Sequence, residues 1–418
     1  MRASSHAALL ALLFVGYASF YLCRANVDAA MPLLVREGYS KASLGQLASI
    51  ATFAYALGKL VMGAVGDALG GRRVIGLAIA GSVVFSLSFG TANTLVAMIV
   101  FASCNRFFQS GGWSGLVHVV ARWFEPRVHG RVMGFLSTSY ELGNVFALTL
   151  SGLVARRGWR ALFVVNPLLF ATVGLVVVAG LPRVPGPATA ALPVLDRGSS
   201  APAEPSAEPE PSLPAVLRGL VVRGSLWVAL ALSALLTFLR VAFLTWTPTY
   251  LFEVSRATGH EEVSGAIVKS AMFPAAGVVA ALVVGFLSDR LGPGRRAPIM
   301  AVSLAVVVVL VLLLGHGGVR EPFAAGALIA GVGLFLLGPY SLLAGAVALD
   351  VAGKRGTATA TGVIDGAGYL GATAAPYALG VTADRAGWSA AFDVVAVAAL
   401  VATAVAAGWT VVVLRKRT

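Results

Sequence analysis

The sequence predicts an all-α membrane protein with twelve transmembrane helices in two pseudo-symmetric six-helix halves. Composition is the first of three observations behind this prediction. Of the 418 residues, 58% are apolar and only 12% are charged, whereas about 25% are charged in a typical soluble domain. The other two observations are the number of long apolar stretches and an internal repeat.

Twelve stretches are long and apolar enough to cross a hydrocarbon core about 30 Å thick, which takes roughly 20 residues of helix. They span residues 7–33, 43–65, 74–93, 95–121, 131–154 and 161–181, and then 225–250, 264–287, 297–315, 322–349, 357–382 and 388–413. Residues 182–222 separate the two sets, are rich in proline and have few bulky apolar side chains. They predict a disordered cytoplasmic linker between an N-terminal bundle (1–181) and a C-terminal bundle (223–418).

The two sets resemble each other at three places that keep their order along the chain. In the first helix of each set an arginine precedes a proline by eight residues, at Arg24 and at Arg240. The other two pairs are Gly-x-x-x-Asp followed by Arg-Arg, at 63–73 and 285–296, and Gly-Trp, at 158–159 and 387–388. Three ordered pairs indicate duplication. Parallel six-helix repeats with a substrate site at their interface are typical of the major facilitator fold.

The net charge of +13 indicates orientation in a membrane, and we expect no nucleic-acid partner. Lysine and arginine are roughly twice as frequent in the loops on the side of the N-terminus as in the opposite loops, which predicts that both termini are cytoplasmic. The two cysteines and five histidines show no metal-ligand spacing. We therefore predict neither a metal site nor a cofactor.

Arg24 and Arg240 are the main candidates for substrate binding. A charged side chain within the hydrocarbon is costly and marks a functional position, and the pseudo-symmetry points both guanidinium groups at one central cavity. A guanidinium offers a planar fork of donors that suits phosphate oxygens, so the pair predicts an oxyanion site. The alternative is that a buried carboxylate neutralises each arginine, and Asp28 is the candidate nearest to Arg24.

Lys59, in the second apolar stretch, is the third predicted source of positive charge in this cavity. Its counterpart in the repeat is Ala281, and the alternative is that its long side chain reaches the membrane interface. Together with Arg24 and Arg240 it would give the empty cavity about three positive charges, which repel one another in a medium of low dielectric constant. We therefore expect the empty carrier to reorient slowly.

Three carboxylates also fall within the apolar stretches, namely Asp28, Glu141 and Asp365. A carboxylate in the membrane can pair with a cation, face the cavity or take up a proton. They are candidates for proton coupling or for cavity charge, and the sequence leaves these roles open, as it does for Lys269. Any of the three carboxylates would offset the positive charge of the cavity.

Two loops are predicted to act as gates on the cytoplasmic side. They contain Asp67, Arg72 and Arg73 in the first half, and Asp289, Arg295 and Arg296 in the second. We expect each aspartate to cap a helix N-terminus and to pair with the nearby arginines, which would latch one conformation. Arg106, in the fourth stretch, is interpreted as part of the scaffold.

Four segments carry a more specific signal: FYLCRAN (20–26), AYALGKLVMG (54–63), LRVAFLTWTPTYL (239–251) and GYLGA (368–372). They resemble the organophosphate:inorganic phosphate antiporters, a branch of the major facilitator superfamily that includes the bacterial glycerol-3-phosphate and hexose-6-phosphate transporters. The resemblance runs through all twelve stretches and leaves out only the linker. It implies a multi-pass protein of the bacterial inner membrane, which we expect to be a monomer, and no enzymatic activity.

The resemblance also implies which residues contact the substrate. Arg24 and Arg240 would clamp the phosphate, Lys59 would add charge, and Tyr17, Tyr21, Tyr140, Tyr369 and Trp113 would lie at the site. The chain departs from the family at four positions, where Ala25, Tyr140, Thr237 and Pro274 replace a lysine, a histidine, an aromatic residue and an acidic residue. The phosphate clamp is retained, whereas the groups that recognise the organic part are changed.

We therefore predict a secondary active transporter that moves a phosphate-bearing organic anion across the inner membrane, in exchange for inorganic phosphate and by alternating access. The first alternative is a proton-coupled carrier of another organic anion, with Glu141 or Asp365 as the proton carrier. The second is a membrane-bound sensor. An intramembrane enzyme is disfavoured, because the helices contain no Ser/His, His-Glu-x-x-His or paired-aspartate constellation.

Deletion of residues 190–212 should leave membrane insertion and transport largely intact, because this part of the linker has the composition of a disordered segment. The measurement is the yield of monodisperse protein and its transport rate beside the full chain. Loss of folded protein would show that the linker packs against the helices.

Overall fold

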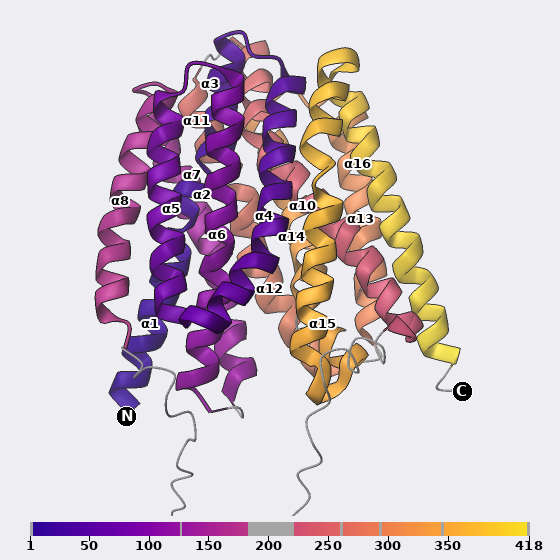
Figure 1. Cartoon of the computed structure of the whole chain (residues 1–418). Coiled ribbons are helices and arrows are strands. Elements are labelled where there is room, and N and C mark those ends of the chain that lie inside the picture. Colours follow the sequence, from indigo (N-terminus) through magenta and orange to yellow (C-terminus); the bar gives the residue numbers. More distant parts are fainter. Residues whose placement is uncertain are drawn as a thin grey trace, which may run out of the picture.

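The computed structural model describes residues 3–125, 128–182, 221–259, 262–291, 295–343 and 347–415, and these residues form a bundle of helices joined by short turns (Figure 1). No β-strand occurs among them. The predicted linker at 182–222 falls almost entirely outside the described residues. The prediction of an all-α protein is confirmed.

The first half contains the helices α1 to α8. Their bounds are α1 (Ala3–Ser19), α2 (Tyr21–Arg24), α3 (Asn26–Arg36), α4 (Lys41–Leu69), α5 (Gly71–Thr91), α6 (Leu95–Trp123), α7 (His129–Ala155) and α8 (Trp159–Gly180). The first three form one membrane span, since Phe20 and Ala25 between them keep right-handed helical dihedral angles. These two irregular residues flank α2, the short segment that ends at Arg24.

The second half contains the helices α10 to α16. Their bounds are α10 (Gly224–Ala257), α11 (Val263–Ser270), α12 (Met272–Leu291), α13 (Arg296–His316), α14 (Pro322–Leu342), α15 (Ala348–Ala372) and α16 (Ala375–Arg415). Helix α16 contains a sharp change of direction at Gly387, whose φ of 80° and ψ of 177° are not helical. Glycine reaches a positive φ without the steric cost that a Cβ atom brings, so a single residue turns the chain back across the bundle.

The spans of the described residues agree with the predicted number of twelve. Nine stretches are apolar and long enough to cross a membrane, and one of them, Ala360–Val413, is 54 residues long and is folded in two at Gly387. Helices α6 and α7, with 29 and 27 residues, are also long enough to cross. Ten spans and these two helices make twelve.

A repeated hydrogen bond supports the duplication. Trp159 Nε1 donates to Glu37 Oε1 at 2.8 Å, and Trp388 Nε1 donates to Glu253 Oε2 at 2.7 Å. The two glutamates are 216 residues apart, the same separation as Arg24 and Arg240. Each tryptophan follows a glycine with positive φ, 91° in the first half and 80° in the second. The two halves therefore share details of backbone geometry as well as sequence motifs.

Both chain ends lie at the same end of the bundle, and α3 and α11 lie at the other (Figure 1). We call the first the terminal end and the second the distal end. An even number of spans requires this placement. It agrees with termini on one side of the membrane, and the cytoplasmic assignment of that side stays a prediction.

The two halves are joined tightly at the distal end by polar contacts that we call the distal seal. Lys41 Nζ of α4 pairs with Glu253 Oε1 of α10 at 2.9 Å. The carboxylate of Asp384, on α16, accepts the backbone N–H groups of Lys41 at 3.2 Å and of Ala42 at 2.7 Å. This anion therefore satisfies two of the N-terminal donors of α4 and lies favourably at the positive end of that helix.

Two glycines allow the backbones to meet in this seal. A Cβ atom at Gly45 would lie 2.5 Å from the carbonyl oxygen of Pro376, and one at Gly380 would lie 2.4 Å from that of Lys41. Helices that approach this closely need small residues at the contact. The distal seal thus closes the cavity between the halves at this end.

The change Gly380→Ala should push the halves apart at the distal seal, because the added methyl group has no space, and such overpacking costs about 1–3 kcal/mol. We expect faster alkylation from the distal side of a cysteine introduced at Ala48, in a chain with Cys23 and Cys104 replaced. Gly63→Ala is the matched control, since a Cβ atom there meets nothing within 4 Å. Equal labelling rates in the two variants would contradict the closed seal.

Candidate functional site

Arg24 lies among tyrosine rings from three helices. Its guanidinium carbon is 4.2 Å from the ring centre of Tyr55, on α4, and 5.5 Å from that of Tyr21, on α2. Its Nη2 donates to the hydroxyl of Tyr369, on α15, at 3.3 Å. Among the described residues Arg24 forms no ion pair, so cation–π contacts, worth about 0.5–2 kcal/mol each, and one neutral acceptor hold its charge in place.

Arg240 is paired, in contrast to Arg24. Its Nη2 lies 3.2 Å from Oε1 of Glu141, and both side chains are only 3% exposed. The pair joins α10 of the second half to α7 of the first. The rings of Tyr140 and Tyr340 flank the guanidinium at 5.4 and 5.1 Å. Glu141 Oε2 and Arg240 Nε have no hydrogen-bond partner within the described part of the chain.

Lys59 and Asp365 form a second ion pair between the halves, from α4 to α15. Their side chains are 16% and 25% exposed, so they are better hydrated than Arg240 and Glu141. Lys59 Nζ also lies 4.7 Å from the ring centre of Tyr369. The lysine is therefore directed into the bundle, beside the tyrosine rings that surround Arg24, and does not extend to the membrane interface.

Asp28 lies 3.6 Å from Nη2 of Arg106, on α6, and does not neutralise Arg24. The alternative that Asp28 neutralises Arg24 is therefore not seen, whereas a buried carboxylate does neutralise Arg240. The chain leaves regular helix geometry between Arg24 and Asp28, at Ala25, while Arg106 approaches from a different helix. Arg106 also lines the central cavity, and its interpretation as scaffold stays a prediction.

These residues lie around one space between the halves, the central cavity. Its lining includes Tyr21, Arg24, Asp28, Thr52, Tyr55, Arg106, Asn144, Arg240, Thr245 and Tyr369. Four cations and three carboxylates lie in or beside it and give a formal charge of about +1. The cations are Arg24, Lys59, Arg106 and Arg240, and the carboxylates are Asp28, Glu141 and Asp365. The expectation of three uncompensated positive charges is therefore wrong, because Arg240 and Lys59 each bring a carboxylate from the opposite half.

The remaining predicted site residues lie at different depths. Tyr21 and Tyr369 line the space directly, and Tyr140 contacts the Arg240 guanidinium. Tyr17 and Trp113 form a layer behind Tyr21, with their rings 4.9 Å apart. The aromatic residues that the resemblance implied at the site thus include some that line the cavity and some that lie one layer behind it.

Besides Arg106, four polar lining residues escaped the prediction, namely Thr52, Tyr55, Asn144 and Thr245. A signal was present for Tyr55, because it precedes Lys59 by four residues and so shares its helix face. Thr52 and Asn144 are polar residues on otherwise apolar stretches, and nothing in the sequence separates them from other such residues.

The predicted gating loops differ from expectation. Asp67 lies in the last turn of α4, and its Oδ1 is 2.8 Å from Nε2 of His118, on α6. It caps no helix N-terminus, and the expected pairing with Arg72 and Arg73 is wrong. The loop between α4 and α5 is the single residue Gly70, with φ of 81°, which leaves Asp67 on the helix.

In the second half Arg296 pairs with Asp350, on α15, and donates to Ser288 Oγ at 3.0 Å. Arg295 is exposed. The side chain of Asp289 lies outside the described residues. These contacts of Arg296 stay within the second half, so a latch across the halves at the terminal end stays a prediction.

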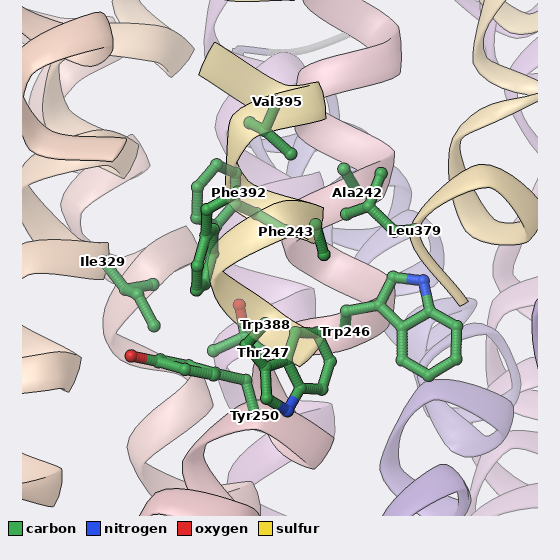
Figure 2. A pocket seen from close by; sticks show the side chains of 11 residues that line it. Ala242, Phe243, Trp246, Thr247, Tyr250, Ile329, Leu379, Trp388, Phe392 and Val395 are labelled. Carbon is green, nitrogen blue, oxygen red and sulfur yellow. The ribbon is translucent and has the colours of Figure 1, made fainter. Parts of the chain in front are cut away.

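A second pocket lies within the second half, among α10, α14 and α16 (Figure 2). Tyr250, Trp388 and Phe392 turn their rings toward one another along it, with the Tyr250 and Phe392 ring centres 4.9 Å apart. No charged side chain lines this pocket. It therefore lacks the donors that a phosphate needs, and the central cavity is the candidate site.

Replacing Arg24 or Arg240 with alanine should abolish transport, and replacing either with lysine should impair it severely. Lysine keeps the charge and loses the fork, and one lost hydrogen bond to a charged group costs about 1.5–3 kcal/mol, or roughly a ten- to hundredfold loss of affinity. The effect of Lys59→Ala on transport should be milder. The measurement is phosphate affinity in purified protein.

Arg106→Lys is the control for these variants, because its 3.6 Å contact with Asp28 needs only a positive charge. Native affinity in the Arg24→Lys and Arg240→Lys variants would show that these arginines act as bulk charges and that no bidentate clamp exists.

Comparison with known proteins identifies the family. The model of the Major Facilitator Superfamily matches residues 13–376. A probable hexose phosphate transport protein of Chlamydia pneumoniae is 28% identical, over 91% of this chain and 86% of its own length. The glycerol-3-phosphate transporter of Bacillus subtilis is 26% identical, over 91% and 86%. The membrane sensor protein UhpC of Escherichia coli is 26% identical, over 94% and 89%.

The fold has a solved counterpart as well. A bacterial homologue of the human lysosomal transporter Spinster, crystallised in an inward-facing and unoccupied conformation, superposes with a TM-score of 0.82 over 99% of both chains, at 15% identity. The chain therefore belongs to the Major Facilitator Superfamily, and its resemblance to the organophosphate:inorganic phosphate antiporters within that superfamily is confirmed.

Proposed function

We propose that this chain exchanges a phosphate ester for inorganic phosphate across the bacterial inner membrane, by alternating access and with both termini in the cytoplasm. One observation carries the proposal: Arg24 is the only cation of the cavity that forms no ion pair among the described residues. A buried guanidinium without a counter-ion is costly. An anionic substrate would supply the missing negative charge.

The site suits a phosphate group. Arg24 comes from the first half and Arg240 from the second, and both line the same space. An oxyanion between them would accept hydrogen bonds from two guanidinium forks, the geometry that favours phosphate and carboxylate. The relatives are named as hexose phosphate and glycerol-3-phosphate transporters, so the organic part of the ester would be of the size of glycerol or a hexose.

The ion pairs between the halves support exchange. The Arg240–Glu141 and Lys59–Asp365 pairs bridge the two halves while the distal seal is closed. A phosphate that bridges Arg24 and Arg240 offers a different connection, which the empty carrier lacks. A ligand can drive a conformational change only through such differential stabilisation. The loaded carrier should therefore reorient much faster than the empty one.

A sensor of phosphate esters is the second candidate function. It is favoured by the similarity to UhpC, which is named as a membrane sensor and aligns over 94% of this chain. A sensor would bind the same ester at the same two arginines. It would not move the ester across the membrane at a useful rate, so transport measurements separate the two functions.

Proteoliposomes loaded with inorganic phosphate should take up labelled phosphate rapidly, and empty vesicles should take it up slowly with or without a pH gradient. External glycerol-3-phosphate and glucose-6-phosphate should compete with the label, and unphosphorylated glycerol should not. Fast uptake into empty vesicles under a pH gradient would reject exchange in favour of proton-driven transport. Binding of esters without any counterflow would favour the sensor.

A further inference from the structure

Glu141 already accepts a hydrogen bond from the guanidinium of Arg240 that a phosphate would bind. Its Oε1 lies 3.2 Å from Nη2 of Arg240, one of the donors that the proposed clamp offers to the substrate. A guanidinium has a limited number of donors, and two anions that approach the same edge repel each other. Phosphate and Glu141 therefore compete for Arg240, and this competition is absent at Arg24.

If phosphate took Arg240 away from Glu141, the carboxylate of Glu141 would be left buried and charged without a counter-ion. The side chain is 3% exposed, and its Oε2 already lacks a hydrogen-bond partner among the described residues. The charged and titratable groups around the pair are Arg240 from α10, Arg24 and Tyr21 from α2, Tyr140 from α7, and Tyr340 from α14. Both arginines would be engaged by the phosphate, and the tyrosines carry no positive charge.

The other two carboxylates near the cavity keep their cations. Asp365 is paired with Lys59 and Asp28 with Arg106, and neither cation belongs to the proposed clamp. Their side chains are also more exposed, at 25% and 11%. Of these three carboxylates, Glu141 is therefore the one that would lose its cation when the substrate binds.

We propose that a phosphate dianion binding between Arg24 and Arg240 displaces Glu141, and that the freed carboxylate takes up one proton, so that phosphate and proton are bound together. This inference rests on the proposed function. The step forms an O–H bond on Glu141 with a proton from water and breaks no bond in the phosphate. A buried carboxylate that loses its counter-ion is stabilised by becoming neutral.

The proton balances the charge of the loaded cavity. The empty cavity has a formal charge of about +1, a dianion changes it to −1, and one proton returns it to zero. A neutral complex is the least costly form to move through a medium of low dielectric constant. Since ester and inorganic phosphate would each bind with the same proton, an exchange cycle moves no net proton, and a pH gradient does not drive it.

Isothermal titration with inorganic phosphate at pH 8, in two buffers of different ionisation enthalpy, measures the protons taken up on binding. Phosphate is mostly a dianion at this pH, so selective binding of the monoanion would also take up a proton, and the comparison with Glu141→Gln separates a proton on Glu141 from one on the phosphate. We expect about one proton per phosphate for the native chain and close to none for Glu141→Gln. From pH 8 to pH 9 the native affinity should fall up to tenfold, because binding takes up a proton, and that of Glu141→Gln should change much less.

Two variants control this experiment. Glu141→Asp retains a carboxylate and should retain proton uptake, which separates the loss of a titrating group from a loss of packing. Asp365→Asn removes a different cavity carboxylate and should still take up the proton, because Glu141 loses its counter-ion there as well, whatever the net charge of the cavity. Uptake that persists in Glu141→Gln, or that is missing in the native chain, overturns the inference while the exchange function stands. A native chain that binds neither phosphate nor an ester overturns the proposed function itself.

Discussion

The cost of an uncompensated charge in a medium of low dielectric constant governs how this molecule is arranged. Three buried or half-buried cations in the middle of the bundle each have a carboxylate from another helix, and two of these pairs connect one half to the other. The fourth cation, Arg24, is surrounded by tyrosines instead. Because the cost of burial is high, this difference is the ground on which an anionic substrate is proposed at Arg24.

Much of the fold follows from the sequence, since spans of about 20 apolar residues are a direct consequence of bilayer thickness. The repeat was also visible, because Arg24 and Arg240 sit at equivalent positions. The partners of these arginines were not predictable. Arg240 meets Glu141 across 99 residues of chain, and nothing in local pattern indicates which of several helices brings a carboxylate to it. Proximity in sequence favoured Asp28 for Arg24, whereas packing brings Arg106 to Asp28.

The duplicated elements have diverged in use. In the first half Glu37 accepts a hydrogen bond from Trp159, and in the second half Glu253 accepts the equivalent bond from Trp388. Glu253 also pairs with Lys41 of the opposite half, and that ammonium lies 5.5 Å from the Trp388 ring centre. One copy of the motif thus stabilises its own bundle, while the other also fastens the two bundles together at the distal seal.

The path of α15 and α16 links the cavity to this seal mechanically. Asp365, paired with Lys59, and Asp384, which holds the first turn of α4, lie nineteen residues apart on these two helices. Thr373, at the junction between them, keeps helical dihedral angles. At the helical rise of ~1.5 Å per residue these nineteen residues, with a turn at 373–374 between the helices, span about 28 Å and are treated as one rod. A tilt of roughly 10° about its midpoint would displace each end by ~2.5 Å, enough to stretch hydrogen bonds of normal length beyond their range. Rotation of this one rod would therefore strain both attachments at once.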